Sequence, residues 1–186
     1  MNGSGENVAG CASCAGRCCR EYRVAVTVAD VRTLAAGTDL HPREFITLRP
    51  VESTRTGFRI RPRGPAHELN LIRRPANGGC VFLMEIAPGK ARCGAYTHRP
   101  LVCRSYPTFL KAGAVAVRPD VKCGPGSWSL AAMDLPGYRR DLVHSQAAWI
   151  EHWKIVTAWN AALDAAAPDA APADLYEFLL TGAMPR

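Results

Sequence analysis

The segment CASCAGRCC at residues 11–19 places four cysteines within nine residues, and it constrains the chain more than any other feature. Thiols this close together serve disulfides, a metal centre or reactive-thiol chemistry. The N-terminal sequence MNGSGENVAG has neither the basic nor the apolar region of a signal peptide, so we expect a cytoplasmic protein with reduced thiols. Clustered cysteines in such a protein indicate metal binding or redox chemistry rather than disulfides.

Eight cysteines among 186 residues are too few for a disulfide scaffold. On a helix, the first three would lie within about 60° of one another, and a CxxC turn would bring the first two to one ion equally well. The spacing matches neither the bacterial ferredoxin run nor a zinc ribbon, so it does not identify the metal. Adjacent side chains diverge, so we expect Cys18 and Cys19 to serve two centres, or one centre and one free nucleophile. The predicted metal ligands are Cys11, Cys14, Cys18, Cys19, Cys80, Cys93, Cys103 and Cys123.

The hydrophobic pattern predicts an α+β fold, with a small antiparallel sheet and short helices around the cysteine-ligated centre. Thr27 and Asp30 resemble a capping box with a helix stop at Gly37, and Pro42 suits the first position of a second helix with Phe45, Ile46 and Leu48 on its apolar side. Alternating apolar residues predict strands in the segments 57–64, 67–75, 80–86, 107–113 and 114–120, and one helical turn within 97–107.

From about Leu135 the pattern is that of an amphipathic helix, followed by the linker AAAPDAAPA and the short terminal helix DLYEFLL. The expected apolar face consists of Leu142, Trp149, Trp153, Val156, Asn160 and Leu163, whereas His144 and His152 are expected in solvent. We therefore divide the chain into a flexible tail (1–10), a cysteine-cluster metal-binding domain (11–125) and a helical C-terminal extension (126–186).

The formal charge of +7 is carried mainly by arginine. A basic surface is typical of nucleic-acid binding, but four thiolates on one Zn²⁺ leave a net charge of −2, which nearby arginines would offset. We do not expect nucleic-acid binding. No stretch is apolar enough for a membrane span, so no membrane partner is expected either.

The later cysteines lie in the pattern C-x₂-Y-x₂-R-P-x₂-C-R-x-Y-P, formed by Cys93, Tyr96, Arg99, Pro100, Cys103, Arg104, Tyr106 and Pro107. With CxxCxxxCC and the strand-borne Cys80, this resembles the YkgJ-like family of bacterial cysteine-cluster proteins, described as zinc- or iron-chelating, over residues 11–125. A similar cysteine module occurs in flagellin lysine N-methylases and is associated there with an iron–sulfur cluster. The resemblance implies a [4Fe–4S] cluster rather than zinc, but the chain lacks the glycine-rich loop of a conventional methyltransferase.

Four residues beside the cysteines are candidates for cofactor binding. Arg99 and Arg104 could donate hydrogen bonds to cluster sulfurs, and Tyr96 and Tyr106 could do the same or act as general acids. Tyrosines in such positions also occur as core aromatics with a satisfied hydroxyl. His98 is a weaker candidate for a replacement ligand, and no catalytic residue is assigned.

Two functions from different classes follow. The first is an iron–sulfur protein whose cluster performs redox or substrate-activating chemistry; with three cysteine ligands, an open iron could bind a substrate or S-adenosylmethionine in a methyltransferase-like enzyme. The second is a structural or metal-handling zinc protein with closed four-cysteine sites that acts through a protein–protein surface. Neither the substrate nor the partner is encoded in a motif.

Overall fold

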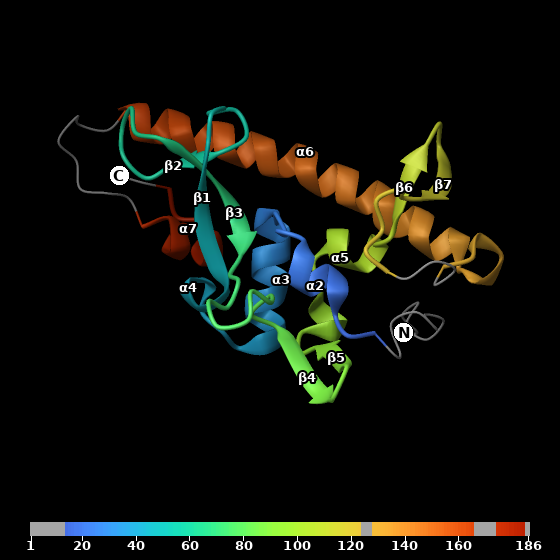
Figure 1. The fold of residues 1–186 in the computed structure, drawn as a ribbon. Helices are drawn as coiled ribbons and strands as arrows, with labels where there is room; N and C mark the ends of the chain where they lie inside the picture. The colour runs from blue at the N-terminus through green and yellow to red at the C-terminus, as the bar shows by residue number, and fades with distance from the viewer. Residues whose placement is uncertain (1–13, 124–127, 166–173, 185–186) are drawn as a thin grey trace. The chain divides into compact units, whose positions relative to one another are not determined.

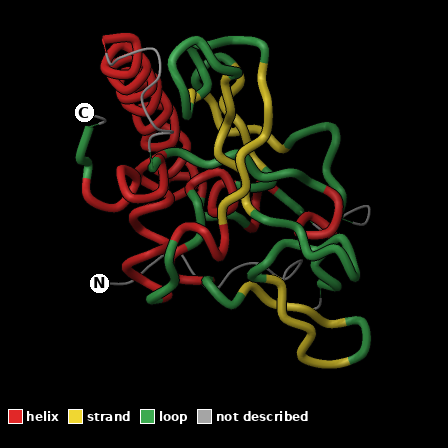
Figure 2. The backbone as a smooth tube through the Cα atoms, turned by 90° about the vertical axis from the view of Figure 1, so that its left-hand side faces the viewer, coloured by secondary structure: helices red, strands yellow, loops and turns green. Residues whose placement is uncertain are grey.

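The computed structural model describes residues 14–123, 128–165 and 174–184 (Figure 1). The predicted tail, Cys11 and all but the first residue of the predicted linker lie outside these ranges. The predicted α+β class is confirmed: short helices, small antiparallel sheets and a long C-terminal helix make up the chain (Figure 2). No helix in the described ranges is long and apolar enough to cross a membrane.

The chain folds as two compact units, each made of two separate segments. We call residues 1–23 and 73–146 the cysteine unit, and residues 24–72 and 147–186 the core unit. This division rests on compactness in space, and the three-part division made from the sequence stays a prediction.

The cysteine unit contains short elements only, apart from the start of one long helix. Two separate antiparallel hairpins, β4–β5 and β6–β7, are its sheets. In chain order the elements are α2 (Arg17–Glu21), β4 (Leu83–Ala87), β5 (Lys90–Cys93), the 3₁₀ helix η1 (Tyr96–His98), α5 (Leu101–Ser105), β6 (Thr108–Lys111), β7 (Ala114–Val117) and the 3₁₀ helix η2 (Leu130–Ala132).

The core unit is built on an antiparallel sheet with the strand order β1-β3-β2, and α7 packs against α3 and α4. Helix α6 begins in the cysteine unit and continues into the core unit. The elements are α3 (Val28–Thr38), α4 (Pro42–Phe45), β1 (Ile46–Val51), β2 (Phe58–Arg59), β3 (Ala66–Leu71), α6 (Leu135–Ala165) and α7 (Leu175–Thr181).

Local sequence signals explain where the first helices of the core unit begin. The Thr27 side chain accepts a hydrogen bond from the backbone of Asp30, and Asp30 returns one, so the predicted capping box is confirmed. The predicted stop at Gly37 is wrong, because α3 continues to Thr38 and ends at Asp39, which has a φ of 56°. Pro42 begins α4 as predicted.

The second predicted helix is shorter than expected. Ile46 and Leu48 belong to β1 rather than to a helix, and they pair with Leu71 and Leu69 of β3. Because both strands bury apolar residues, pairing outweighs the local helical signal. The predicted sheet is also not continuous, since the strands form three separate sheets.

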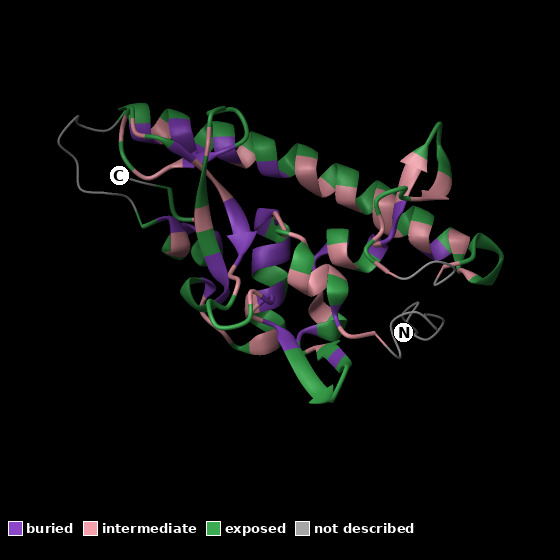
Figure 3. Cartoon of the chain, in the orientation of Figure 1, coloured by how far each residue is buried: buried purple, intermediate pink, exposed green. Residues whose placement is uncertain are grey.

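The buried side of α6 differs from the predicted apolar face (Figure 3). Val156, Trp159 and Leu163 are fully buried, but Trp153 is 42% exposed. His152, which was expected in solvent, is only 2% exposed, and its Nδ1 accepts a hydrogen bond from the Val28 N–H at 3.3 Å. That bond satisfies one of the free N–H groups at the start of α3.

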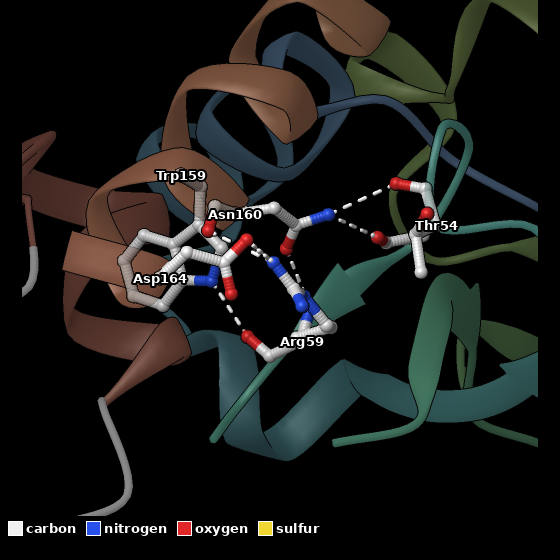
Figure 4. Close-up of polar contacts among 6 residues, drawn as sticks. Thr54, Arg59, Trp159, Asn160 and Asp164 are labelled. Carbon is white, nitrogen blue, oxygen red and sulfur yellow. Dashed lines mark hydrogen bonds and ion pairs between the residues drawn. The ribbon is translucent and has the colours of Figure 1, made fainter. Parts of the chain in front are cut away.

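Asn160 of α6 fixes the turn between β1 and β2 (Figure 4). Its amide nitrogen donates to the carbonyls of Thr54 and Gly57 at 2.9 and 3.0 Å, and its oxygen accepts the Arg59 N–H at 2.9 Å. The neighbouring Trp159 donates its indole N–H to the Arg59 carbonyl at 2.6 Å. These bonds satisfy polar groups of the turn, and the Gly57 carbonyl among them lies in a buried residue.

Candidate metal centre

Helix α2 presents the adjacent cysteines of the first cluster. Their sulfur atoms lie 3.9 Å apart, so the prediction that the side chains of Cys18 and Cys19 diverge is wrong. The helix follows Gly16, whose φ is 74° and where a Cβ would lie 2.5 Å from a methyl carbon of Leu83. Only glycine fits both the conformation and the space. Cys14 precedes this helix, so a single helix does not align it with Cys18.

Backbone hydrogen bonds join the first cluster to the later cysteines. The Ala91 N–H of β5 donates to the Cys14 carbonyl at 2.9 Å, and the Cys80 N–H donates to the Cys19 carbonyl at 2.8 Å. Cys93 is the last residue of β5, two residues beyond Ala91. These hydrogen bonds bring the segments of Cys80 and Cys93 beside the first cysteine cluster.

Three of the cysteines share a local backbone arrangement. The Gly16 N–H donates a hydrogen bond to the Cys14 sulfur at 3.2 Å. In the same way, the N–H of the residue two positions after Cys80 and after Cys93 donates to the sulfur of that cysteine; these residues are Phe82 and Ala95. A hydrogen bond to sulfur favours the thiolate, which is the form that binds metal. Turns of this kind orient the three sulfurs and favour the charged form that a metal would bind.

Five sulfurs influence one another electrostatically. Burial raises the pKa of Cys103 well above its usual value, and the charges of Cys80 and Cys18 raise it further. Burial also raises the pKa of Cys93, with a contribution from Cys18. In the adjacent pair, the shared hydrogen bond lowers the pKa of Cys18 to about 7 and raises the pKa of Cys19. The neutral thiol is therefore favoured at Cys19, Cys80, Cys93 and Cys103, though not at Cys18, while only protein surrounds them, and a bound cation would reverse this preference.

Arg99 is the predicted cofactor-binding arginine whose charge reaches these sulfurs. Its charge acts to lower the pKa values of Cys18, Cys93 and Cys103, against the effect of burial. The guanidinium carbon lies 3.8 Å from the ring centre of Tyr96, and Arg99 Nε donates to the Tyr96 carbonyl at 3.0 Å. Tyr96 therefore supports Arg99, while its own ring is 38% exposed.

The other two candidates have different surroundings. Arg104 forms an ion pair with Asp141 of α6 at 2.8 Å. The Tyr106 hydroxyl accepts the Lys122 N–H at 2.8 Å and lies 3.9 Å from the Cys123 sulfur. Burial raises the pKa of Tyr106, which keeps its hydroxyl protonated.

Two arginines beside the site were missed by the sequence interpretation. Arg73 and Arg74 act to lower the pKa of Cys80, although burial raises it overall. They lie at the end of the predicted strand 67–75. Apart from their positive charge, nothing in the sequence indicated that they would lie near Cys80.

The donor set fits a thiophilic metal. Cysteine sulfur is a preferred ligand of zinc and of iron–sulfur clusters. His98, the weaker candidate ligand, donates its backbone N–H to the Ala95 carbonyl. Within the part of the chain that the structure describes, no three cysteine, histidine, aspartate or glutamate side chains lie close enough to hold one ion. Among the described cysteines, the sulfurs are gathered but no three of them form the shell of a single ion.

Residues 10–124 match the model of the CxxCxxCC family, which is described as "Putative zinc- or iron-chelating domain". The chain belongs to the CxxCxxCC family. No curated protein and no solved structure matches it. The matched region includes all eight cysteines, and membership of the CxxCxxCC family supports a metal-binding protein that chelates zinc or iron.

Proposed function

We propose that this protein carries an iron–sulfur cluster of the [4Fe–4S] type, held by cysteines and used for redox or substrate-activating chemistry. One observation carries the proposal: backbone hydrogen bonds bring the segments of Cys80 and Cys93 beside the first cysteine cluster, although no three candidate ligands in the described ranges are close enough for a single ion. A four-iron cluster is larger than one ion, so its ligands lie farther apart and surround it from several chain segments.

The candidate ligands exceed what one cluster requires. A [4Fe–4S] cluster takes four thiolates, and Cys18, Cys19, Cys80, Cys93 and Cys103 form the group from which they would come. The remaining cysteines would then bind a second metal centre or bind no metal; they are Cys11, Cys14 and Cys123. The bound cluster would supply one-electron chemistry, and Arg99 would offset its negative charge.

The likeness to the YkgJ-like proteins and to the cysteine module of flagellin lysine N-methylases supports the iron–sulfur choice. It does not extend to a reaction. A cluster held by three cysteines would leave one iron open for a substrate or for S-adenosylmethionine.

Zinc is the second candidate, and a specific distance favours it. Two thiolates on one tetrahedral zinc, with Zn–S bonds of about 2.3 Å, lie about 3.8 Å apart. The sulfurs of Cys18 and Cys19 are separated by 3.9 Å. A closed zinc site would hold the cysteine unit together, and the protein would act through a partner surface.

Anaerobic purification with iron, sulfide and zinc analysis and a visible spectrum tests both candidates on one sample. About four irons and four sulfides per chain, with absorption near 400 nm, are expected for the cluster. Zinc without sulfide would overturn the iron–sulfur proposal and support the second candidate. Addition of S-adenosylmethionine to a cluster-bearing sample then tests for an open iron through a change in the spectrum.

A further inference from the structure

Arg73 ties the end of α2 to the segment that carries Cys80. Its two terminal nitrogens donate to the carbonyls of Tyr22, at 2.6 Å, and of Arg20. These carbonyls lie at the C-terminal end of α2, where the backbone lacks internal partners and carries partial negative charge. A planar guanidinium can reach two carbonyls at once, which an ammonium group does less well.

Arg74 makes the same kind of contact in the opposite direction along the chain. Its terminal nitrogens donate to the carbonyls of Leu83, at 2.8 Å, and of Val81. These two residues flank Phe82, whose N–H serves the Cys80 sulfur. Arg74 therefore holds the turn that orients Cys80.

The backbone between the two arginines and Cys80 completes the connection. Arg73 pairs with Cys80 as an isolated antiparallel bridge, and the Arg74 N–H donates to the Gly79 carbonyl at 2.7 Å. The Cys80 N–H in turn donates to the Cys19 carbonyl. Two short segments, one with the adjacent cysteines and one with Cys80, are thus fixed to each other at both side-chain and backbone level.

We propose that Arg73 and Arg74 are positioning residues of the metal centre, whose paired guanidinium contacts hold Cys18, Cys19 and Cys80 in place and whose charge offsets that of bound thiolates. The inference rests on the proposed metal centre but not on which metal occupies it. It predicts that the two arginines determine how strongly metal is retained, although neither is a ligand.

Three variants of the full chain separate the two roles of Arg73. Arg73→Met removes both the charge and the paired guanidinium donors while keeping an unbranched side chain. Arg73→Lys keeps the charge but loses the paired donors. Arg92→Met is the matched control, because Arg92 is an exposed arginine on β5 next to Cys93. Each is purified anaerobically, its bound metal is measured, and the rate of metal release to excess EDTA is followed at fixed pH.

Arg73→Met is expected to release metal about 10–100 times faster than the unmodified chain, as is usual when residues around metal ligands are lost. Arg73→Lys should fall between the two, and Arg92→Met should stay within about twofold of the unmodified chain by comparison. If the metal is a cluster, Arg73→Met should also lower its midpoint potential, because a nearby positive charge favours the reduced form, whereas Arg73→Lys should not. A residue with a merely structural role would leave that potential unchanged.

Equal release from Arg73→Met and Arg92→Met would overturn the inference while leaving the metal centre intact. If Arg73→Met does not fold, Arg73→Lys decides, and release at the unmodified rate would overturn the inference. Zinc in place of a cluster would overturn the iron–sulfur proposal alone, because the release rates still test the role of Arg73. An unmodified chain that takes up neither zinc nor iron would overturn both proposals.

Discussion

The core unit and the cysteine unit have similar numbers of described residues but differ in what they bury. Sixteen of the buried apolar residues belong to the core unit, and six belong to the cysteine unit. All the largest fully buried side chains, among them Trp159, Phe45 and Phe58, are in the core unit. The cysteine unit instead contains all seven described cysteines, with short elements joined by backbone and arginine hydrogen bonds.

This difference indicates two sources of folding free energy. Burial of apolar surface is the main favourable term for a core of ordinary size. A unit with few buried apolar side chains needs another source, and metal binding supplies it when the ligands come from segments that are separate in the sequence. We therefore expect the two units to respond differently to the same perturbation.

Metal removal should have the largest effect and should separate the units most clearly. Anaerobic chelation is expected to unfold the cysteine unit, because the free energy of metal binding is then part of its folding free energy. Hydrogen exchange read by peptide should show lost protection around Cys80 and Cys93, with protection retained in α3 and α7. Equal loss in both units, or no loss in either, would contradict the comparison.

Trp159→Ala should destabilise the core unit by about 3–5 kcal/mol, because it removes a fully buried side chain and leaves a cavity. The ring lies 4.5 Å from that of Phe178, centre to centre. Urea unfolding followed by circular dichroism measures the loss, and metal content should remain unchanged. Trp153→Ala is the matched control on the same helix; since Trp153 is already 42% exposed, it should cost under about 1 kcal/mol. Loss of metal in Trp159→Ala would show that the units are not independent.

Acid should weaken the core unit through His152. Burial lowers the pKa of His152 to about 4, while an unfolded histidine titrates near pH 6.5. The unfolded state therefore binds a proton first as the pH falls, and stability should decrease between about pH 6.5 and pH 4, by about 3 kcal/mol in total. This contribution is constant above that window. Urea unfolding at several pH values measures it.

His152→Asn provides the control for acid sensitivity, since its amide oxygen can accept the Val28 N–H without titrating. The variant will be less stable at neutral pH, but its stability should depend less on pH across the window. An unchanged slope would assign the acid sensitivity to another group. His144, which is exposed on the same helix, should show no such effect when replaced.

The sequence allowed the elements with strong local signals to be predicted. The capping box at Thr27, the helix start at Pro42 and the long helix from Leu135 depend on neighbouring residues, so they could be read directly. β1 could not, because its pairing with β3 is a long-range preference that overrides a local helical pattern. His152 was misplaced for a similar reason: the N–H that it satisfies belongs to Val28, far away in the sequence.

The same limit applies to the metal centre. Cysteine spacing indicated the ligand candidates, and Arg99 became a candidate because it lies in the cysteine motif. The short distance between the Cys18 and Cys19 sulfurs depends on side-chain rotamers, and adjacency in the sequence does not determine these. Arg73 and Arg74 are proposed for the site because of their contacts with Tyr22 and Leu83, and nothing in the local sequence indicates those partners.

The contacts of Arg73 also fasten together the two ends of a long excursion of the chain. Residues 24–72 leave the cysteine unit just after Tyr22 and return just before Arg73, and the Leu71 N–H donates to the Val24 carbonyl at the base of this loop. Closing a loop costs entropy that grows only with the logarithm of its length, and each doubling adds about 0.6 kcal/mol. The turn between β2 and β3, residues 60–65, can therefore lengthen at little cost to the cysteines that flank the excursion, whereas its helices and strands belong to the packed core. Within the excursion, relatives are expected to differ most in length at this turn.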